Sequence, residues 1–188
     1  MEATETDRLT IRTVVESDRA RFVELFTDEA FTVFSDGVHD IESANLRFDR
    51  MLSLADLVPY AKQPVIVRAT GMIVGYTGVG TLVVEGMDRL EWGWRLAPDA
   101  RGQGYATEAT TALLARADAH EAGELLCIIA VDNVASRRVA DKVGFRWRQR
   151  IDWSGDPSDP VDLLERTVGG GGPPLLAPDP TRPRPSVS

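Results

Sequence analysis

The sequence predicts an α+β fold in which helices pack on a mostly antiparallel sheet. The predicted elements run strand, helix, helix, then several consecutive strands, then helix, strand, helix and two strands. Consecutive short strands between glycines favour antiparallel pairing, and grouped helices and strands are typical of the α+β class. At 188 residues the chain is long enough for one domain with a sizeable core.

The first third of the chain carries one strand pattern and two helix patterns. Apolar and polar residues alternate over residues 8–13, which predicts a strand with one buried face. Ser17 and Asp18 offer a helix cap, and apolar residues then recur at helical spacing up to residue 26. A second helix is predicted over about residues 40–55, with a loop between the two helices.

The middle of the chain changes to short β-branched runs between glycines, which predict strands. These runs are residues 65–67, 72–74, 81–84 and 90–96. The last run stops before Pro98, because proline cannot donate to a sheet ladder.

The remaining elements follow a glycine-rich turn. They are a helix over 105–119, an apolar strand over 125–131, a short helix over about 132–142, and strands at 145–147 and 161–168. Residues 169–188 are rich in glycine and proline, and this composition predicts a disordered tail. The folded domain is therefore expected to span residues 1–168.

Composition restricts the function. The chain has 21 basic and 29 acidic residues, a formal net charge of -8, which argues against general nucleic-acid binding and fits a cationic acceptor better. Cys127 is the only cysteine and is predicted to be buried packing, and His39 and His120 lie far apart, so no metal site is expected. An acidic, polar start and the lack of a long apolar run predict a cytoplasmic protein without a membrane span.

The segment with most chemical information is the turn at residues 101–106. Its glycines allow several backbone amides to point into one concavity, and the following helix contributes its positive end. Such a turn binds a diphosphate. The chain has no Gly-x-Gly-x-x-Gly on its first strand-helix turn and no Gly-Lys-Ser/Thr, so dinucleotide and triphosphate sites are disfavoured.

The spacing Arg101-x-x-Gly104-x-Ala106 resembles the diphosphate signature of GNAT acetyltransferases. Downstream, Asn133-x-x-Ser136 and a following Lys-Val-Gly-Phe resemble the closing segment of RimJ/RimL-type members, and the likeness covers residues 8–168. The resemblance implies the GNAT fold, with a mixed, mostly antiparallel sheet of six to seven strands splayed at the cofactor cleft and about four helices. It also implies an acetyl-CoA-dependent N-acetyltransferase.

The resemblance further implies a cofactor site. The diphosphate would lie against the turn, and pantetheine would run along the strand end that contains Trp94. The Leu96 amide would polarise the thioester carbonyl, Asn133 would hold the pantetheine arm, and Ser136 would lie near the sulfur. The implied cofactor residues are Trp94, Leu96, Arg101, Gly102, Gln103, Gly104, Tyr105, Ala106, Asn133 and Ser136.

Catalysis needs a base for the amine and an acid for the leaving thiolate. Glu91 is the candidate base, unless strand register turns it to solvent as an ordinary surface carboxylate. Some GNAT enzymes use a tyrosine as the acid at the position of Ala140, so Ser136 is the candidate substitute here.

The acceptor is predicted to contact Phe31, Phe34, His39 and Trp92. Each has a simpler interpretation, since aromatic residues on a sheet are commonly core and a loop histidine is commonly at the surface. A protein N-terminal α-amine is the favoured acceptor, and a small amine such as an antibiotic or polyamine is the alternative. A non-catalytic acetyl-CoA-binding module and a nucleotide-binding protein also stay open, as do a monomer and a homodimer.

Overall fold

The computed structural model describes residues 3–34, 37–84, 87–120, 122–152 and 160–168. The chain divides into two compact units. One unit comprises Met1–Gly80 and Gly93–Ala117, and the other comprises Thr81–Trp92 and Asp118–Ser188. The tail at 169–188, predicted to be disordered, lies outside the described residues.

Eight strands form a mixed sheet with the neighbour order β1-β2-β3-β4-β5-β6-β8-β7, rather than the six to seven strands expected. The strand that the sequence did not predict is β1 (Thr4–Glu5), which is too short to show an alternating pattern. The two runs predicted at 72–74 and 81–84 are one strand, β4 (Ile73–Val84). The glycines between them therefore lie inside a strand and do not end it.

The strands of the first unit pair antiparallel at its outer edge. β2 (Leu9–Ile11) pairs with β1 on one side and with β3 (Gln63–Val67) on the other. β3 pairs with β4, with a register shift between Val65 and Ile66. The predicted strands in this part of the chain are confirmed, and each is slightly longer or shorter than its apolar pattern.

Gly75 brings the backbones of β4 and β5 (Met87–Leu96) unusually close together. Its φ angle is 152°, and a Cβ built there would lie 2.0 Å from the carbonyl oxygen of Arg95 and 2.9 Å from Leu96 Cα. Just beyond, the Ala97 amide donates to the Val74 carbonyl at 2.8 Å. Only glycine fits this position, so the last residues of β5 are held directly against β4.

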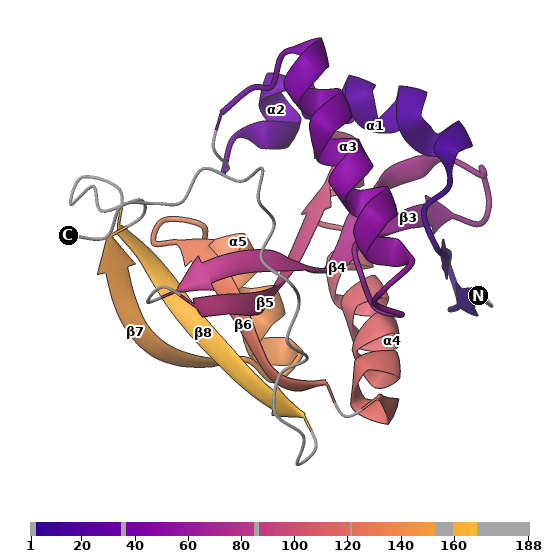
Figure 1. Cartoon of the computed structure of the whole chain (residues 1–188). Coiled ribbons are helices and arrows are strands. Elements are labelled where there is room, and N and C mark those ends of the chain that lie inside the picture. The colour runs from indigo at the N-terminus through magenta and orange to yellow at the C-terminus, as the bar shows by residue number, and fades with distance from the viewer. Residues whose placement is uncertain (1–2, 35–36, 85–86, 121, 153–159, 169–188) are drawn as a thin grey trace. The chain divides into compact units, whose positions relative to one another are not determined.

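Both helices predicted in the first third of the chain are confirmed. They are α1 (Arg19–Phe26), which follows the 3₁₀ turn η1 (Glu16–Asp18), and α3 (Ile41–Ala55), and the two lie side by side in Figure 1. The predicted loop between them contains a further turn of helix, α2 (Glu29–Thr32), because the Asp28 side chain accepts from the Ala30 amide at its start. The described residues thus contain five α-helices, where about four were expected.

An aromatic cluster fills the space between these helices and β4. Phe22 packs on Phe26 and Phe48 with ring centroids 5.7 and 5.6 Å apart. Phe31 lies 6.2 Å from Phe26 and 6.3 Å from the ring of Tyr76 on β4. The short helix α2 is therefore attached to the sheet by its one buried aromatic ring.

The second unit contains the parallel part of the sheet. β5 pairs parallel with β6 (Gly123–Ala130) at Glu91 and Leu126, and β6 pairs antiparallel with β8 (Pro160–Val168). β7 (Arg146–Asp152) completes the order beside β8, as Figure 1 shows. Cys127 on β6 is 2% exposed, which confirms its prediction as buried packing.

We expect Gly75→Ala to lower the free energy of unfolding more than Gly71→Ala. Both glycines have positive φ, but an added Cβ at Gly71 would meet nothing within 4 Å, whereas at Gly75 it would strike the Arg95 carbonyl. The difference between the two variants isolates the clash, and we expect it to be at least about 2 kcal/mol in urea unfolding. Equal losses in the two variants would show that β4 and β5 are not in close contact at this point.

Candidate active site

A glycine-rich turn joins the end of β5 to α4 (Tyr105–Ala119) through the short 3₁₀ turn η2 (Pro98–Ala100). Gly102 and Gly104 have φ angles of 75° and 82°, in the left-handed region that favours glycine. An added Cβ at Gly102 would meet no atom within 4 Å, so the turn is open there.

The backbone amides of residues 102–106 have no acceptor in the described part of the chain. The amide of Glu108 is the first to donate into the start of α4, to the Gly104 carbonyl at 3.1 Å. Amides at the start of a helix, on a turn with two left-handed residues, converge on an anion, and the helix dipole adds positive potential. The turn therefore has the donors that a diphosphate group needs.

Arg8, which directly precedes β2, braces this turn from the far end of the chain. Its Nη1 donates to the Gln103 carbonyl at 2.9 Å, and its guanidinium carbon lies 4.7 Å from the centre of the Tyr105 ring. The same guanidinium donates to the Glu108 carboxylate through Nε at 2.8 Å and Nη2 at 2.5 Å. One side chain thus joins the turn to the first turn of α4.

Glu108 completes the brace by accepting from the first strand region. Thr6 Oγ1 donates to its Oε1 at 2.6 Å, and the Arg8 amide donates to the same oxygen at 3.1 Å. Burial acts to raise the pKa of Glu108, but the hydrogen bonds from Thr6 and Arg8 together lower that pKa below its ordinary value. Glu108 is therefore held as a carboxylate.

Arg101 fixes the other side of the turn. Its Nε donates to the Leu96 carbonyl at 3.0 Å, and its Nη2 donates to the Ala30 carbonyl of α2 at 2.6 Å. Burial, and then the positive charge of Arg95, lower the pKa of this guanidinium. The Arg101 side chain thus connects the end of β5 to α2, and Arg101 is also the first residue of the glycine turn.

Two of the predicted residues, Trp94 and Leu96, lie at the end of β5. Leu96 is 7% exposed, Trp94 is half-buried, and Arg95 lies between them. The Arg95 guanidinium carbon lies 5.8 Å from the centre of the Phe31 ring on α2. The structure therefore brings Phe31 to the strand end that was predicted to hold the thioester.

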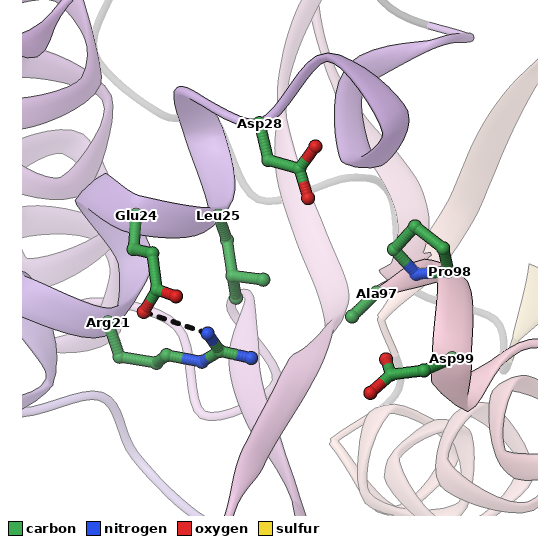
Figure 2. A pocket seen from close by; sticks show the side chains of 7 residues that line it. All are labelled: Arg21, Glu24, Leu25, Asp28, Ala97, Pro98 and Asp99. Atoms are coloured by element: carbon green, nitrogen blue, oxygen red, sulfur yellow. Dashed lines mark ion pairs between the residues drawn. The ribbon is translucent and has the colours of Figure 1, made fainter.

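A shallow hollow lies on the α1 side of this strand end (Figure 2). Its lining residues are Arg21, Glu24, Leu25, Asp28, Ala97, Pro98 and Asp99. Arg21 pairs with Glu24 at 2.8 Å and donates to the Ile73 carbonyl at 3.0 Å. Figure 2 shows the carboxylates of Asp28 and Asp99 facing the space between α1 and η2. The hollow has more acidic than basic groups, so it favours cations.

The other predicted acceptor residues of this unit differ in their surroundings. Phe31 is 1% exposed and belongs to the aromatic core, whereas Phe34 is 49% exposed. The His39 ring nitrogen Nε2 lies 2.8 Å from Arg47 Nη1, and the ring packs edge-on against Phe26. Phe34 is therefore the aromatic residue of this segment that remains available at the surface.

Glu91 and Trp92 lie in the second unit, on β5. Glu91 is half-buried and faces away from Trp92, which is fully buried. Full burial makes Trp92 a core residue, which favours ordinary packing over contact with the acceptor.

Asn133 and Ser136 lie at the start of α5 (Val134–Lys142) in the same unit. The Asn133 side-chain oxygen accepts from the Ser136 amide at 3.0 Å, which caps the helix. The position where other GNAT enzymes have tyrosine, Ala140, is fully buried. Asparagine suits the first position of the motif because its side chain caps the start of α5.

Asp162 on β8 ties α5 to the β7–β8 hairpin. Its carboxylate accepts from Arg137 Nη1 at 3.2 Å, Trp147 Nε1 at 3.2 Å and Arg150 Nε at 3.0 Å. Burial acts to raise its pKa, but Arg150, Trp147 and Arg137 lower the pKa below its usual value. Asp162 thus holds α5 at Arg137, the residue directly after Ser136.

The described residues contain no group of three or more His, Cys, Asp or Glu side chains arranged to bind a metal ion. Among the helices that the structure describes, none has both the length and the apolar character that crossing a bilayer requires.

The structure combines a mixed sheet, which has a parallel β5–β6 pair, with an open amide turn between β5 and α4. Over residues 8–146 the chain matches the model of the acetyltransferase (GNAT) domain. The chain belongs to the GNAT acetyltransferase family and is an N-acetyltransferase.

Individual relatives are distant. The chain is 27% identical over 170 residues to the uncharacterized protein YkkB of Bacillus subtilis, covering 86% of this chain and 93% of that protein. RimL, a ribosomal L7/L12 α-N-protein acetyltransferase solved with coenzyme A, superimposes with a TM-score of 0.74 at 18% identity, covering 89% and 98% of the two chains. The microcin C7 self-immunity acetyltransferase MccE superimposes with a TM-score of 0.69 at 14% identity, covering 87% and 94%. Both structural likenesses show the fold.

Sequence reasoning missed Arg8 and Glu108 as parts of the site. Arg8 belongs to a strand pattern 100 residues before its partner, and a charged residue on an alternating strand looks like an ordinary surface residue. Glu108 lies in the run that follows the glycine turn, so its position in the motif was the one available signal.

We expect Glu108→Gln to reduce stability at neutral pH and to flatten its dependence on acid. Because the pKa of Glu108 is lowered in the folded state, its contribution is complete above the unfolded pKa of about 4.3 and is lost as the pH falls through the folded pKa. The expected loss is roughly 1–2 kcal/mol at pH 7 by urea unfolding, since Arg8 is partly solvated. Glu24→Gln, at a carboxylate that is 69% exposed, is the control and should change little.

Proposed function

We propose that this protein transfers an acetyl group from acetyl-CoA to a primary amine, with the diphosphate bound by the turn at residues 101–106. One observation carries this proposal: the amides of residues 102–106 have no acceptor in the described chain, and a Cβ added at Gly102 would meet no atom within 4 Å. A member of this family needs a diphosphate site, and RimL, which shares the fold, was solved with coenzyme A. The residues present fit that group.

The end of β5 is proposed to hold the thioester. The Leu96 amide would donate to the acetyl carbonyl, and the strand backbone near Trp94 would bind pantetheine. Arg101 contributes by holding the Leu96 carbonyl, which orients the adjoining peptide, and Gly75 contributes by fixing the strand against β4. Small displacements of such a donor reduce catalysis strongly, so a doubly fixed strand end suits this role.

Asn133 and Ser136 are proposed to serve the pantetheine arm and the sulfur. The Asn133 oxygen is used in the helix cap, so its side-chain NH₂ group is the donor that we propose for the cofactor. Ser136 is proposed as the acid for the thiolate, and Glu91 as the base for the amine, acting directly or through water.

For the acceptor we propose the α-amine of a protein N-terminus. An α-amine with a pKa near 8 loses its proton more readily than a lysine near 10.4, which suits direct attack on a thioester. RimL, named as an α-N-protein acetyltransferase, shares the fold and supports this choice. MccE, which is named for self-immunity to microcin C7, shares the fold too and keeps a small-molecule amine as the alternative.

Coenzyme A should stabilise the wild-type protein against thermal unfolding, by about 2.7 kcal/mol at a concentration one hundred times its Kd, whereas ATP and NAD should not. Gly104→Val should abolish this protection, because Gly104 has a φ of 82° and an added Cβ would lie 3.4 Å from Arg8 Nη2. Gly71→Val, at a φ of 70° in a turn between β3 and β4, is the matched control and should retain it. Protection by ATP or NAD in place of coenzyme A would instead indicate a nucleotide site.

Release of free thiol from acetyl-CoA should depend on an amine acceptor. We expect turnover with peptides of differing N-terminal residues to exceed turnover with polyamines and aminoglycosides, measured as kcat/KM. Preference for the small amines would exclude the protein N-terminus as the main acceptor. Protection by coenzyme A without turnover on any acceptor would support a non-catalytic binding module.

A further inference from the structure

Arg95 is a cation for which the described residues provide no anionic partner. Its side chain forms no hydrogen bond or ion pair in the described part of the chain, and its Nη1 is buried without an acceptor. A guanidinium has five N–H donors and is always charged, so leaving it unpaired in a partly buried place is costly. Unsatisfied buried groups of this kind are uncommon in folded proteins, and each needs an explanation, of which an absent ligand is one.

The position of Arg95 is fixed by its surroundings. Its carbonyl packs against Gly75, and its guanidinium lies over the Phe31 ring. Arg95 directly precedes Leu96, the residue proposed to hold the acetyl carbonyl. A cation at this place therefore lies on the strand end where the acceptor must approach the thioester.

Nearby charges do not neutralise Arg95. Arg95 contributes to the lowered pKa of Arg101, so the two positive charges influence one another. The hydrogen bonds of Arg101 go to carbonyl oxygens and bring no negative charge. The negative charge of Asp28 acts to raise the pKa of Arg101. Asp28 Oδ1 accepts from the Ala30 amide, and Asp28 makes no ion pair with Arg95. The Arg95 side chain thus has no carboxylate paired with it, although the chain as a whole has a net charge of -8.

We infer that Arg95 binds a carboxylate of the acceptor, located close to the amine that is acetylated. This inference rests on the proposed function, because it concerns the acceptor of the same site. The half-buried Arg95 side chain can be reached from solvent. Because the guanidinium charge is delocalised, a carboxylate at its accessible edge also offsets the cost of burying Nη1 without a partner. The paired charge then gives specificity for acceptors that carry the anion.

Two kinds of acceptor carry a carboxylate close to an amine. In one it is the side chain of an N-terminal aspartate or glutamate in a peptide, and in the other it is the α-carboxylate of a free amino acid. Both present a planar anion that matches the guanidinium fork. The inference therefore excludes polyamines, which carry no anion, as preferred acceptors.

The experiment compares acceptors in matched pairs, with acetyl-CoA as donor. The first pair is a peptide beginning with glutamate and the same peptide beginning with glutamine, and the second is free alanine and alaninamide. Arg95→Gln should lower kcat/KM for the carboxylate member of the preferred pair by at least about tenfold, and for the amide member by less than about twofold. The KM for acetyl-CoA should not change.

Three variants separate recognition from folding. Arg95→Lys keeps the charge without the paired guanidinium donors and should retain part of the preference for carboxylates. Arg95→Met keeps the packing on Phe31 and should lose this preference. Arg148→Gln removes an exposed arginine of β7 and should behave as wild type. Thermal unfolding with coenzyme A is measured for each variant, so that a misfolded variant is recognised.

Equilibrium binding of the same acceptor pairs to the coenzyme A complex, measured by calorimetry, tests the inference independently of turnover. Equal use or equal binding of carboxylate and amide acceptors by the wild type would overturn it, as would an equal loss for both in Arg95→Gln. If coenzyme A fails to bind, the proposed function fails instead. Turnover of neutral amines with no carboxylate preference would preserve the proposed function and remove the role of Arg95.

Discussion

The close contact between Gly75 and the carbonyl of Arg95 is the constraint on which the proposed site depends. It leaves no room for a side chain between β4 and β5, and it fixes the last residues of β5 relative to β4. The Arg95 side chain and the Leu96 amide belong to this strand end, and the glycine turn begins shortly after it. The same contact therefore positions all three. A glycine inside a strand usually weakens it, so its presence here is best explained by the approach that it permits.

The glycine turn is held by charged side chains rather than by apolar packing. Arg8 and Glu108 hold it to the segment between β1 and β2, and Arg101 connects it to β5 and α2. The amides of the turn are thereby left unpaired without the turn itself being free to collapse. An anion site works best when its donors are oriented before the ligand arrives, because no reorganisation is then needed. The brace at Arg8 supplies this order from a segment that the diphosphate motif does not include.

How far the sequence predicts this structure depends on the range of the interactions. Local patterns predict α1, α3, α4 and the central strands, because periodicity and caps are encoded within a few residues. They fail at β1, whose two residues carry no pattern, and at β4, where glycines that look like turns permit close strand packing. They locate the turn from its motif, but they cannot find Arg8 or the unpaired Arg95, because both depend on contacts between distant segments.

Net charge and local charge lead to opposite expectations for the acceptor. The overall charge of -8 favours a cation, and the carboxylates of Asp28 and Asp99 in the hollow agree with that. At the end of β5, however, the positive charges of Arg95 and Arg101 act on one another, and Arg95 has no paired carboxylate. A positive environment favours the neutral form of an approaching amine, which is the form that attacks a thioester, and it attracts a carboxylate on the same molecule. Long-range attraction of a cationic group and short-range selection of an anionic one are compatible when the acceptor carries both. An amine with an adjacent carboxylate meets both requirements.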